Sequence, residues 1–244
     1  MEKGEKLLNK FGIEDLKVWY NEDRWRDYLS KYEPEHFWAT LGQCYLNTFL
    51  TAEKPGEMFA SNLNFLLPRI ASFSPKSVLE VGCGFGRVLS FLVACEVCEE
   101  IKGVELSESM IAEMPRFVAS INPPLKRELK IIQGDITKGI DFPNQSFDVV
   151  YSHVCLTHIE PRYIDCVTKE ISRIAKKAII HVERFKFPNE HPSPHRWSHD
   201  LVYYYKKLGW VVFDYSEINI EHSTKCLVLV RKGEEYDQGA YDGC

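Results

Sequence analysis

The chain has 244 residues, of which 45% are hydrophobic and 27% are charged. This is the composition of a globular protein, so a disordered chain, a collagen-like repeat and a small disulfide-stapled protein are excluded. The formal net charge of −5 disfavours a protein that binds nucleic acid chiefly by neutralising phosphates.

The N-terminus is charged, and no apolar segment of the secretory type follows it. No run approaches the roughly 20 apolar residues that a membrane span needs. We therefore expect a cytoplasmic protein that does not contact membranes. The eight cysteines show no spacing typical of disulfides or zinc sites. Cys95 and Cys98 form a CxxC, and we expect them one turn apart on a helix as small packing residues.

Residues 1–75 combine helical periodicity with many aromatic side chains, and residues 62–70 suggest an amphipathic helix. We expect this segment to form a helical cap that packs on a core domain at 76–232, followed by a flexible tail at 233–244. Its aromatic residues are candidates to line an acceptor site, although packing on the sheet is favoured for most of them. They are Trp19, Tyr20, Trp25, Tyr28, Phe37, Trp38 and Tyr45.

Within the core domain, strand and helix patterns alternate. Strands are predicted at 77–81, 101–106, 129–132, 147–151 and 178–182 (the last fully apolar), and helices at 87–97, 107–120, 161–176 and 197–207. This order predicts a doubly wound parallel sheet with helices on both faces. Two further strands, at 210–215 and 225–230, are joined too briefly for a crossover. The expected fold is a seven-stranded, mostly parallel α/β sheet with an antiparallel C-terminal edge hairpin and an N-terminal helical extension.

The most informative stretch is a strand that runs into a glycine turn and then a helix, Val78-Leu79-Glu80-Val81-Gly82-Cys83-Gly84-Phe85-Gly86-Arg87. Glycines let a ligand approach the backbone, and the helix N-terminus offers free N–H groups. The dinucleotide fingerprint GxGxxG would require glycine at Arg87. Glu80, two residues before the first glycine, suits a cationic ligand group better than a pyrophosphate.

With this loop the sequence resembles the class I S-adenosylmethionine (SAM)-dependent methyltransferases, which carry E/D-x-G-x-G-x-G. The resemblance continues with Glu105 ending the second strand, Asp135 following the third, and Asp148, expected to be structural, opening the fourth. It implies that Glu105 accepts the ribose hydroxyls, that Asp135 binds the adenine amine, and that Ile136 packs on the ring. The implied cofactor is SAM, with S-adenosylhomocysteine as product. The expected cofactor-binding residues are Glu80, Gly82, Cys83, Gly84, Gly86, Glu105, Leu106, Asp135, Ile136 and Ser152.

The segment after the fourth strand indicates the subclass. It lacks the D/N/S-P-P-aromatic motif of exocyclic-amine nucleic-acid methyltransferases and the Pro-Cys of cytosine-C5 enzymes. A metal-dependent subset carries E-x-x-E-H here. His158 matches its last residue, but Val154 and Thr157 replace the glutamates, so no metal is expected. What remains resembles enzymes that methylate an oxygen or nitrogen of a small molecule.

Catalytic candidates come from loops at the carboxyl ends of the strands. Ser152 and His153 follow the fourth strand, and Glu183 ends the fifth. His191, His195 and His199 are spaced four apart, but intervening prolines oppose a continuous helix and hence a helical metal site. The predicted catalytic residues are His153, Glu183, His195 and His199.

Other functions stay open. The chain is alternatively an RNA or protein methyltransferase, or a SAM-binding subunit without turnover of its own. A nicotinamide-dependent oxidoreductase is disfavoured by Arg87. The sequence indicates neither the acceptor nor the oligomeric state.

Overall fold

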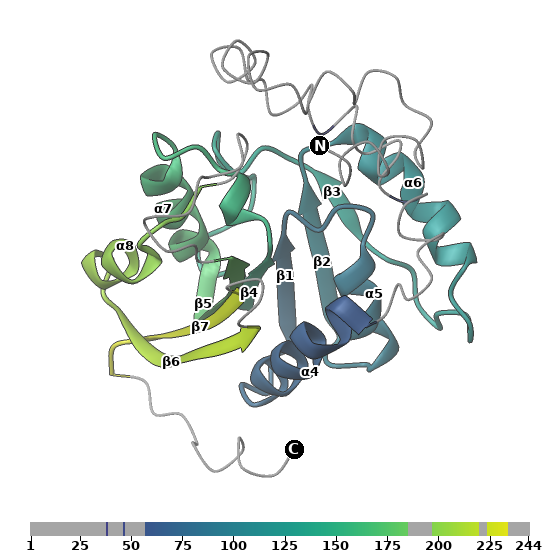
Figure 1. Ribbon diagram of the computed structural model, residues 1–244, viewed down its shortest axis with the longest axis horizontal. Helices are drawn as coiled ribbons and strands as arrows, with labels where there is room; N and C mark the ends of the chain where they lie inside the picture. The colour runs from purple at the N-terminus through teal and green to yellow at the C-terminus, as the bar shows by residue number, and fades with distance from the viewer. Residues whose placement is uncertain (1–37, 39–45, 47–56, 185–196, 220–223, 234–244) are drawn as a thin grey trace, which may run out of the picture.

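The computed structural model describes residues 38, 46, 57–184, 197–219 and 224–233. A seven-stranded sheet in the order β3-β2-β1-β4-β5-β7-β6 forms the centre of the molecule (Figure 1). Its strands are β1 (Ser77–Val81), β2 (Glu100–Glu105), β3 (Ile131–Gln133), β4 (Phe147–His153), β5 (Ala175–Arg184), β6 (Trp210–Asn219) and β7 (Thr224–Arg231). The first five run parallel, whereas β7 pairs antiparallel with both β5 and β6. The predicted sheet with its antiparallel edge hairpin is confirmed.

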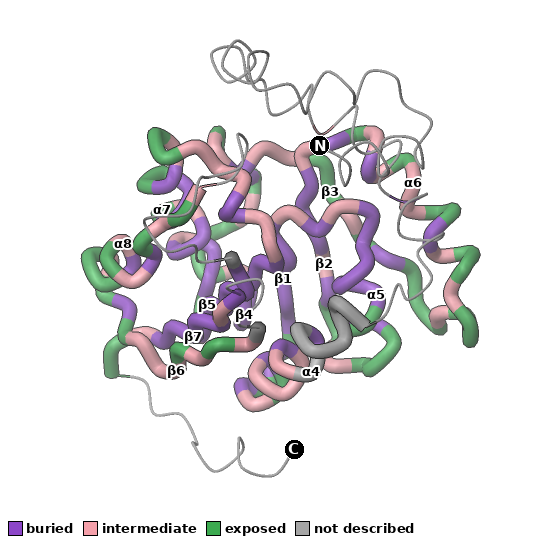
Figure 2. Tube along the Cα trace, viewed as in Figure 1, coloured by how far each residue is buried: buried purple, intermediate pink, exposed green. Residues whose placement is uncertain are grey.

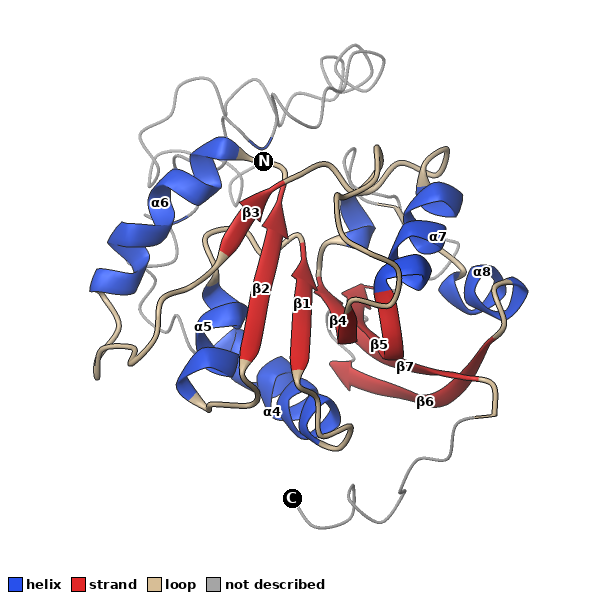
Figure 3. Cartoon of the chain, turned by 180° about the vertical axis from the view of Figure 1, so that it is seen from behind, coloured by secondary structure: helices blue, strands red, loops and turns tan. Residues whose placement is uncertain are grey.

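Helices cover both faces of the sheet (Figure 3). One face carries α4 (Glu57–Ala71), α5 (Arg87–Ala94) and α6 (Glu108–Ala119), and the other carries α7 (Ile164–Ile174) and α8 (Leu201–Lys207). A short 3₁₀ helix, η2 (Leu156–His158), follows β4. Because parallel strands are packed on both sides, β1 and β4 are buried along their whole length (Figure 2). This double layer fixes the strand ends, where the candidate site lies.

Local sequence signals placed several elements correctly. The strand at 77–81 has the predicted limits, and α6 begins after Ser107, whose Oγ accepts a hydrogen bond from the Met110 N–H. The predicted helix around residues 62–70 is α4, and Leu66 and Ile70 are fully buried against the sheet. Leu46, also in the predicted cap, packs with Phe85 of the glycine turn. Residues 1–37, 39–45, 47–56 and 234–244 lie outside the described residues, so the domain limits stay a prediction.

α5 and β4 end at residues other than those predicted. α5 ends at Ala94 because Glu96 adopts a left-handed conformation with φ of +51°. Cys95 therefore caps the helix and Cys98 lies beyond it, so the placement of both cysteines on one helix was wrong. β4 continues to His153 and thus contains Ser152, which was expected to follow the strand.

Other elements begin later than predicted. α7 starts at Ile164 rather than at 161, because residues 160–163 form a turn closed by a hydrogen bond from the Tyr163 N–H to the Glu160 carbonyl. α8 starts at Leu201 rather than at 197, because Asp200 caps it by accepting the Tyr203 N–H. β3 spans 131–133 instead of 129–132. Among the described helices, none has the length and apolar character that crossing a bilayer requires.

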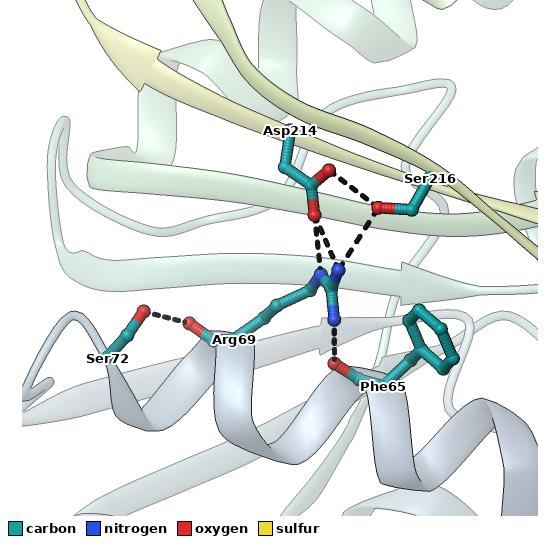
Figure 4. Close-up of polar contacts among 5 residues, drawn as sticks. All are labelled: Phe65, Arg69, Ser72, Asp214 and Ser216. Atoms are coloured by element: carbon teal, nitrogen blue, oxygen red, sulfur yellow. Dashed lines mark hydrogen bonds and ion pairs between the residues drawn. The ribbon is translucent and has the colours of Figure 1, made fainter. Parts of the chain in front are cut away.

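One polar cluster ties α4 to the edge strand β6 (Figure 4). Arg69 donates from Nε and Nη2 to Asp214 Oδ2 at 2.8 and 2.6 Å, and from Nη2 to Ser216 Oγ at 3.1 Å. Its Nη1 donates to the Phe65 carbonyl at 3.1 Å, and the guanidinium lies 4.7 Å from the Phe65 ring centroid. The Arg69 and Asp214 side chains are only 13% and 24% exposed. This cluster holds the first described helix on the edge hairpin.

We predict that Arg69→Met lowers the free energy of unfolding by about 1–3 kcal/mol, because the Asp214 carboxylate loses its charged partner in a partly buried place. Urea unfolding followed by circular dichroism measures this. The matched control is Lys169→Met, which breaks an ion pair with Asp165 whose side chains are 59% and 58% exposed. The control should change stability by no more than about 0.5 kcal/mol. Equal losses in the two variants would contradict a structural role for the Arg69 cluster.

Candidate cofactor-binding site

The glycine turn after β1 is folded against β2. Gly82, Gly84 and Gly86 have φ of +70°, +57° and +86°. The N–H groups of Gly82 and Cys83 both donate to the Val104 carbonyl, at 2.8 and 3.1 Å, and the Gly86 N–H donates to the Cys83 carbonyl at 3.0 Å. The turn therefore delivers the chain from the strand end directly to the N-terminus of α5, the arrangement that the sequence predicted.

Gly82 is required by space as well as by its backbone conformation. A Cβ built on Gly82 would lie 2.2 Å from Cys155 Sγ, because the loop after β4 packs directly on the turn. No side chain fits at that separation. Cys83 is buried toward β2, where a Cβ on Gly103 would lie 2.4 Å from its Sγ. The turn is thus in contact with the strands on both sides of β1.

Glu105 links the glycine turn to the start of α6. Its Oε2 accepts the Gly84 N–H at 2.7 Å, and its Oε1 accepts the Ser107 N–H at 2.9 Å. The side chain is buried, and burial raises the pKa of its carboxyl, although the backbone donors oppose that rise. Leu106, also predicted for the site, lies between Glu105 and Ser107 in the sequence. Ser107 was recognised as a helix cap but not as a partner of Glu105.

Glu80 is buried beneath the turn. Its Oε2 accepts a hydrogen bond from the Tyr151 hydroxyl at 2.7 Å. Burial raises the pKa of Glu80 to about 8, while the Tyr151 hydroxyl and the positive charge of Arg87 oppose the rise. A cation bound nearby would favour the ionised carboxylate, which agrees with the sequence-based expectation for this acid.

Asp135 organises the turn after β3. Its Oδ1 accepts the Thr137 N–H at 2.9 Å and the Thr137 hydroxyl at 2.6 Å. Its Oδ2 lies 3.0 Å from Lys138 Nζ, on a side chain that is 72% exposed. Ile136, expected to pack on an adenine ring, is largely buried in the core. Asp148, by contrast, lies at the other end of β4 and accepts the Lys76 N–H, as expected for a structural residue.

A buried polar network lies behind the ends of β4 and β5. Ser152 Oγ lies 2.8 Å from His181 Nδ1 and donates to Glu183 Oε1 at 2.6 Å. Glu183 also accepts the backbone N–H groups of residues 155–157. The strand at 178–182 was described as fully apolar, which was wrong, since His181 is buried within it. The one polar residue in this otherwise apolar strand was the sequence signal that could have indicated the buried network.

The predicted catalytic histidines are not all brought together. His153 is the buried last residue of β4, at the carboxyl edge. His199 Nε2 lies 2.9 Å from the Ile159 carbonyl, and burial lowers the pKa of its imidazole. His191 and His195 lie outside the described residues. Within the described part of the chain, no three His, Cys, Asp or Glu side chains are grouped as metal ligands, and the expectation of no metal stays a prediction.

Trp38 from the predicted cap reaches the same edge. Its carbonyl accepts hydrogen bonds from the hydroxyls of Ser107 and Ser109, at 3.1 and 3.3 Å. Its ring meets the His158 ring edge-on, with centroids 4.8 Å apart. Because β1 lies between β2 and β4, Trp38 spans from the start of α6 to η2 across the end of β1. The sequence placed it only among several aromatic residues of the cap.

We predict that Glu80 contributes a loss of stability to the ligand-free protein as pH rises from 5 to 8. With a folded pKa of about 8 and an ordinary unfolded pKa, Glu80 holds more proton in the folded state throughout this range. Stability therefore falls as pH rises, by up to about 1.4 kcal/mol per pH unit from this group. Glu80→Gln should flatten the dependence in urea unfolding at several pH values. Asp165→Asn, at an exposed carboxylate, should retain the wild-type slope, and an equally steep Glu80→Gln protein would refute the assignment.

Comparison with known proteins identifies this arrangement. Residues 78–178 match the sequence family described as a methyltransferase domain. Magnesium protoporphyrin IX methyltransferase from Synechocystis PCC 6803, solved with S-adenosylhomocysteine, aligns with a TM-score of 0.62 at 13% identity, over 81% of this chain and 98% of that one. A SAM-dependent methyltransferase from Aquifex aeolicus aligns with a TM-score of 0.54 at 18% identity, over 75% and 95%.

The methyltransferase domain of bacterial CtHen1 aligns with a TM-score of 0.56 at 17% identity, over 70% of this chain and 97% of that one. At these identities the structural likenesses establish the fold, and the sequence match over the glycine turn and the following strands identifies the domain. Residues 78–178 thus form a methyltransferase domain, and the chain has the fold of methyltransferases solved with S-adenosylmethionine or S-adenosylhomocysteine.

Proposed function

We propose that this enzyme transfers a methyl group from SAM to an oxygen or nitrogen of a small-molecule acceptor. The observation that carries the proposal is the charge at the carboxyl edge. The buried charged side chains described there are three acids, Glu80, Glu105 and Glu183, and one base, Arg87. Acids outnumber the base among these side chains, which suits the cationic sulfonium of SAM better than the phosphates of a nucleic acid.

The described residues fit this cofactor. Each carboxylate oxygen of Glu105 accepts one backbone N–H, which leaves lone pairs for the two ribose hydroxyls. The glycine turn leaves open backbone for the methionine portion at Gly84, where an added Cβ would lie no closer than 4.0 Å to its nearest neighbour, Met110 Sδ. When bound, SAM supplies an electrophilic methyl group on a sulfonium. The protein's task is then to hold the acceptor atom in line with that group and to exclude water.

An acceptor hydroxyl or ammonium must lose a proton, and His153 is the residue we propose for that step. It ends β4 at the carboxyl edge. Glu183 is a weaker candidate, because four donors already occupy its carboxylate. His199 is engaged with the Ile159 carbonyl. We infer that the proton leaves through the His153 imidazole.

The aromatic contact above β1 supports a small acceptor of low charge. Trp38 and His158 meet edge-on there, and the Trp38 ring carries no charge. The structural neighbour from Synechocystis acts, by its name, on magnesium protoporphyrin IX, a small molecule with an extended ring. The same fold therefore accommodates an acceptor of this class. RNA and protein acceptors stay as alternatives that the acceptor assay separates.

We predict that Asp135→Asn weakens S-adenosylhomocysteine binding by about 1–3 kcal/mol, measured by isothermal titration calorimetry. The amide keeps an oxygen for the Thr137 donors, but its NH₂ would face the adenine amine, placing a donor against a donor. Asp141→Asn, at an exposed carboxylate later in the same β3–β4 loop, serves as the control and should bind as the wild type does. Unchanged affinity in Asp135→Asn would show that adenine binds elsewhere.

The acceptor class is tested by incubating the enzyme and SAM with separated fractions of a cell extract and measuring S-adenosylhomocysteine by mass spectrometry. We expect product with the dialysable metabolite fraction and none with the RNA or protein fractions. Product that depends on RNA and disappears after ribonuclease treatment would make the chain an RNA methyltransferase. Binding of SAM with no product in any fraction would favour a SAM-binding subunit without turnover.

A further inference from the structure

Four buried polar side chains form a continuous hydrogen-bonded chain from α8 to the loop after β4. They are Tyr205 in α8, His181 and Glu183 in β5, and Ser152 in β4, with 0%, 0%, 3% and 0% of their surface exposed. The Tyr205 hydroxyl lies 2.8 Å from His181 Nε2, His181 Nδ1 lies 2.8 Å from Ser152 Oγ, and Ser152 Oγ lies 2.6 Å from Glu183 Oε1.

The chemistry of these groups fixes the direction of each bond. Glu183 accepts from Ser152, so the Ser152 oxygen must accept from His181 Nδ1–H. Burial lowers the pKa of His181 to about 3, so the imidazole is neutral and its Nε2 accepts from the Tyr205 hydroxyl. Every member therefore has a partner, which is the condition under which a buried polar network is stable. Each group in the chain therefore donates toward the Glu183 carboxylate, which accepts the last hydrogen bond.

Glu183 in turn holds three consecutive backbone amides. Its Oε1 accepts the N–H groups of Cys155 and Leu156 at 3.1 and 3.0 Å, and its Oε2 accepts the Thr157 N–H at 3.2 Å. Successive N–H groups that converge in this way form an anion-binding concavity. Here the carboxylate of Glu183 fills this concavity, although Glu183 lies 26 to 28 residues from these amides in the sequence.

The backbone that these bonds hold is an unfavourable one. Val154 has φ of +53°, a conformation that a β-branched residue rarely adopts. Its N–H donates to the Val182 carbonyl at 2.8 Å, next to Glu183 in the same strand. The following residue, Cys155, packs on Gly82 of the glycine turn. A strained backbone in contact with the turn thus persists because β5 imposes it.

We propose that Glu183 is a positioning residue that fixes the backbone of residues 155–157 against the glycine turn, with Ser152, His181 and Tyr205 holding its carboxylate in place. The proposal rests on the proposed location of SAM at this edge of the sheet. Glu183 then acts on the cofactor site through the backbone, and it does not take a proton from the acceptor.

The test compares Glu183→Gln and Ser152→Ala with the wild type in the full-length protein. The glutamine amide keeps one oxygen for the Cys155 and Leu156 N–H groups but places its NH₂ against the Thr157 N–H, so we expect the Thr157 amide to exchange with deuterium at least about tenfold faster. S-adenosylhomocysteine binding, measured by calorimetry, should weaken by about tenfold. Ser152→Ala removes one bond to the carboxylate and should give a smaller change in both measurements. It also keeps the proposal testable if Glu183→Gln does not fold.

Glu170→Gln is the matched control, because Glu170 also accepts a backbone N–H, from Ile140, but in α7 away from the glycine turn. It should leave exchange at 155–157 and ligand affinity unchanged, even if both glutamine variants lose comparable thermal stability. Wild-type exchange and wild-type affinity in Glu183→Gln would overturn the proposal, and a loss confined to methyl transfer would make Glu183 the base. A wild-type protein that fails to bind S-adenosylhomocysteine would refute the function, while exchange at 155–157 would still decide the role of Glu183.

Discussion

The glycine turn after β1 is held between its two neighbours in the sheet, and the rest of the carboxyl edge depends on this double contact. On one side, the Val104 carbonyl and the Glu105 carboxylate accept N–H groups of the turn. On the other, Cys155 approaches Gly82 so closely that no side chain fits between them. A displacement of either neighbour would therefore move the backbone on which the cofactor is proposed to lie. On the Cys155 side, hydrogen bonds from residues 154–157 to Val182 and Glu183 of β5 hold the loop in place.

Burial of several acids at one edge is costly unless each has donors. Glu105 and Glu183 each accept backbone N–H groups, and Glu80 accepts the Tyr151 hydroxyl. Even so, burial raises the pKa of all three carboxyls. The ligand-free site consequently stores an unfavourable electrostatic energy, which a bound cation reduces. A sulfonium is such a cation, whereas its demethylated product is a neutral thioether. At the proposed location of SAM, the electrostatic attraction is therefore weaker for the product than for SAM itself.

The sequence predicted those features that depend on neighbouring residues. The glycine turn, the limits of β1 and the Ser107 cap follow from signals within a few positions. Helix ends were less accurate where a side-chain cap or a single left-handed residue decides them, as at Asp200 and Glu96. The role of Glu183 was missed because its partners are backbone groups more than 25 residues away, which no residue pattern records. Trp38 likewise meets Ser107 only through the fold.

The position of β7 has a consequence for how the protein is made. It is the last described strand in the chain, yet it lies inside the sheet, between β5 and β6. During synthesis β5 therefore keeps an unpaired edge, and β6 has no neighbour, until residues 224–231 have emerged from the ribosome. An exposed apolar edge of this kind invites pairing with other chains. The nascent domain is thus most vulnerable to aggregation just before its final strand arrives.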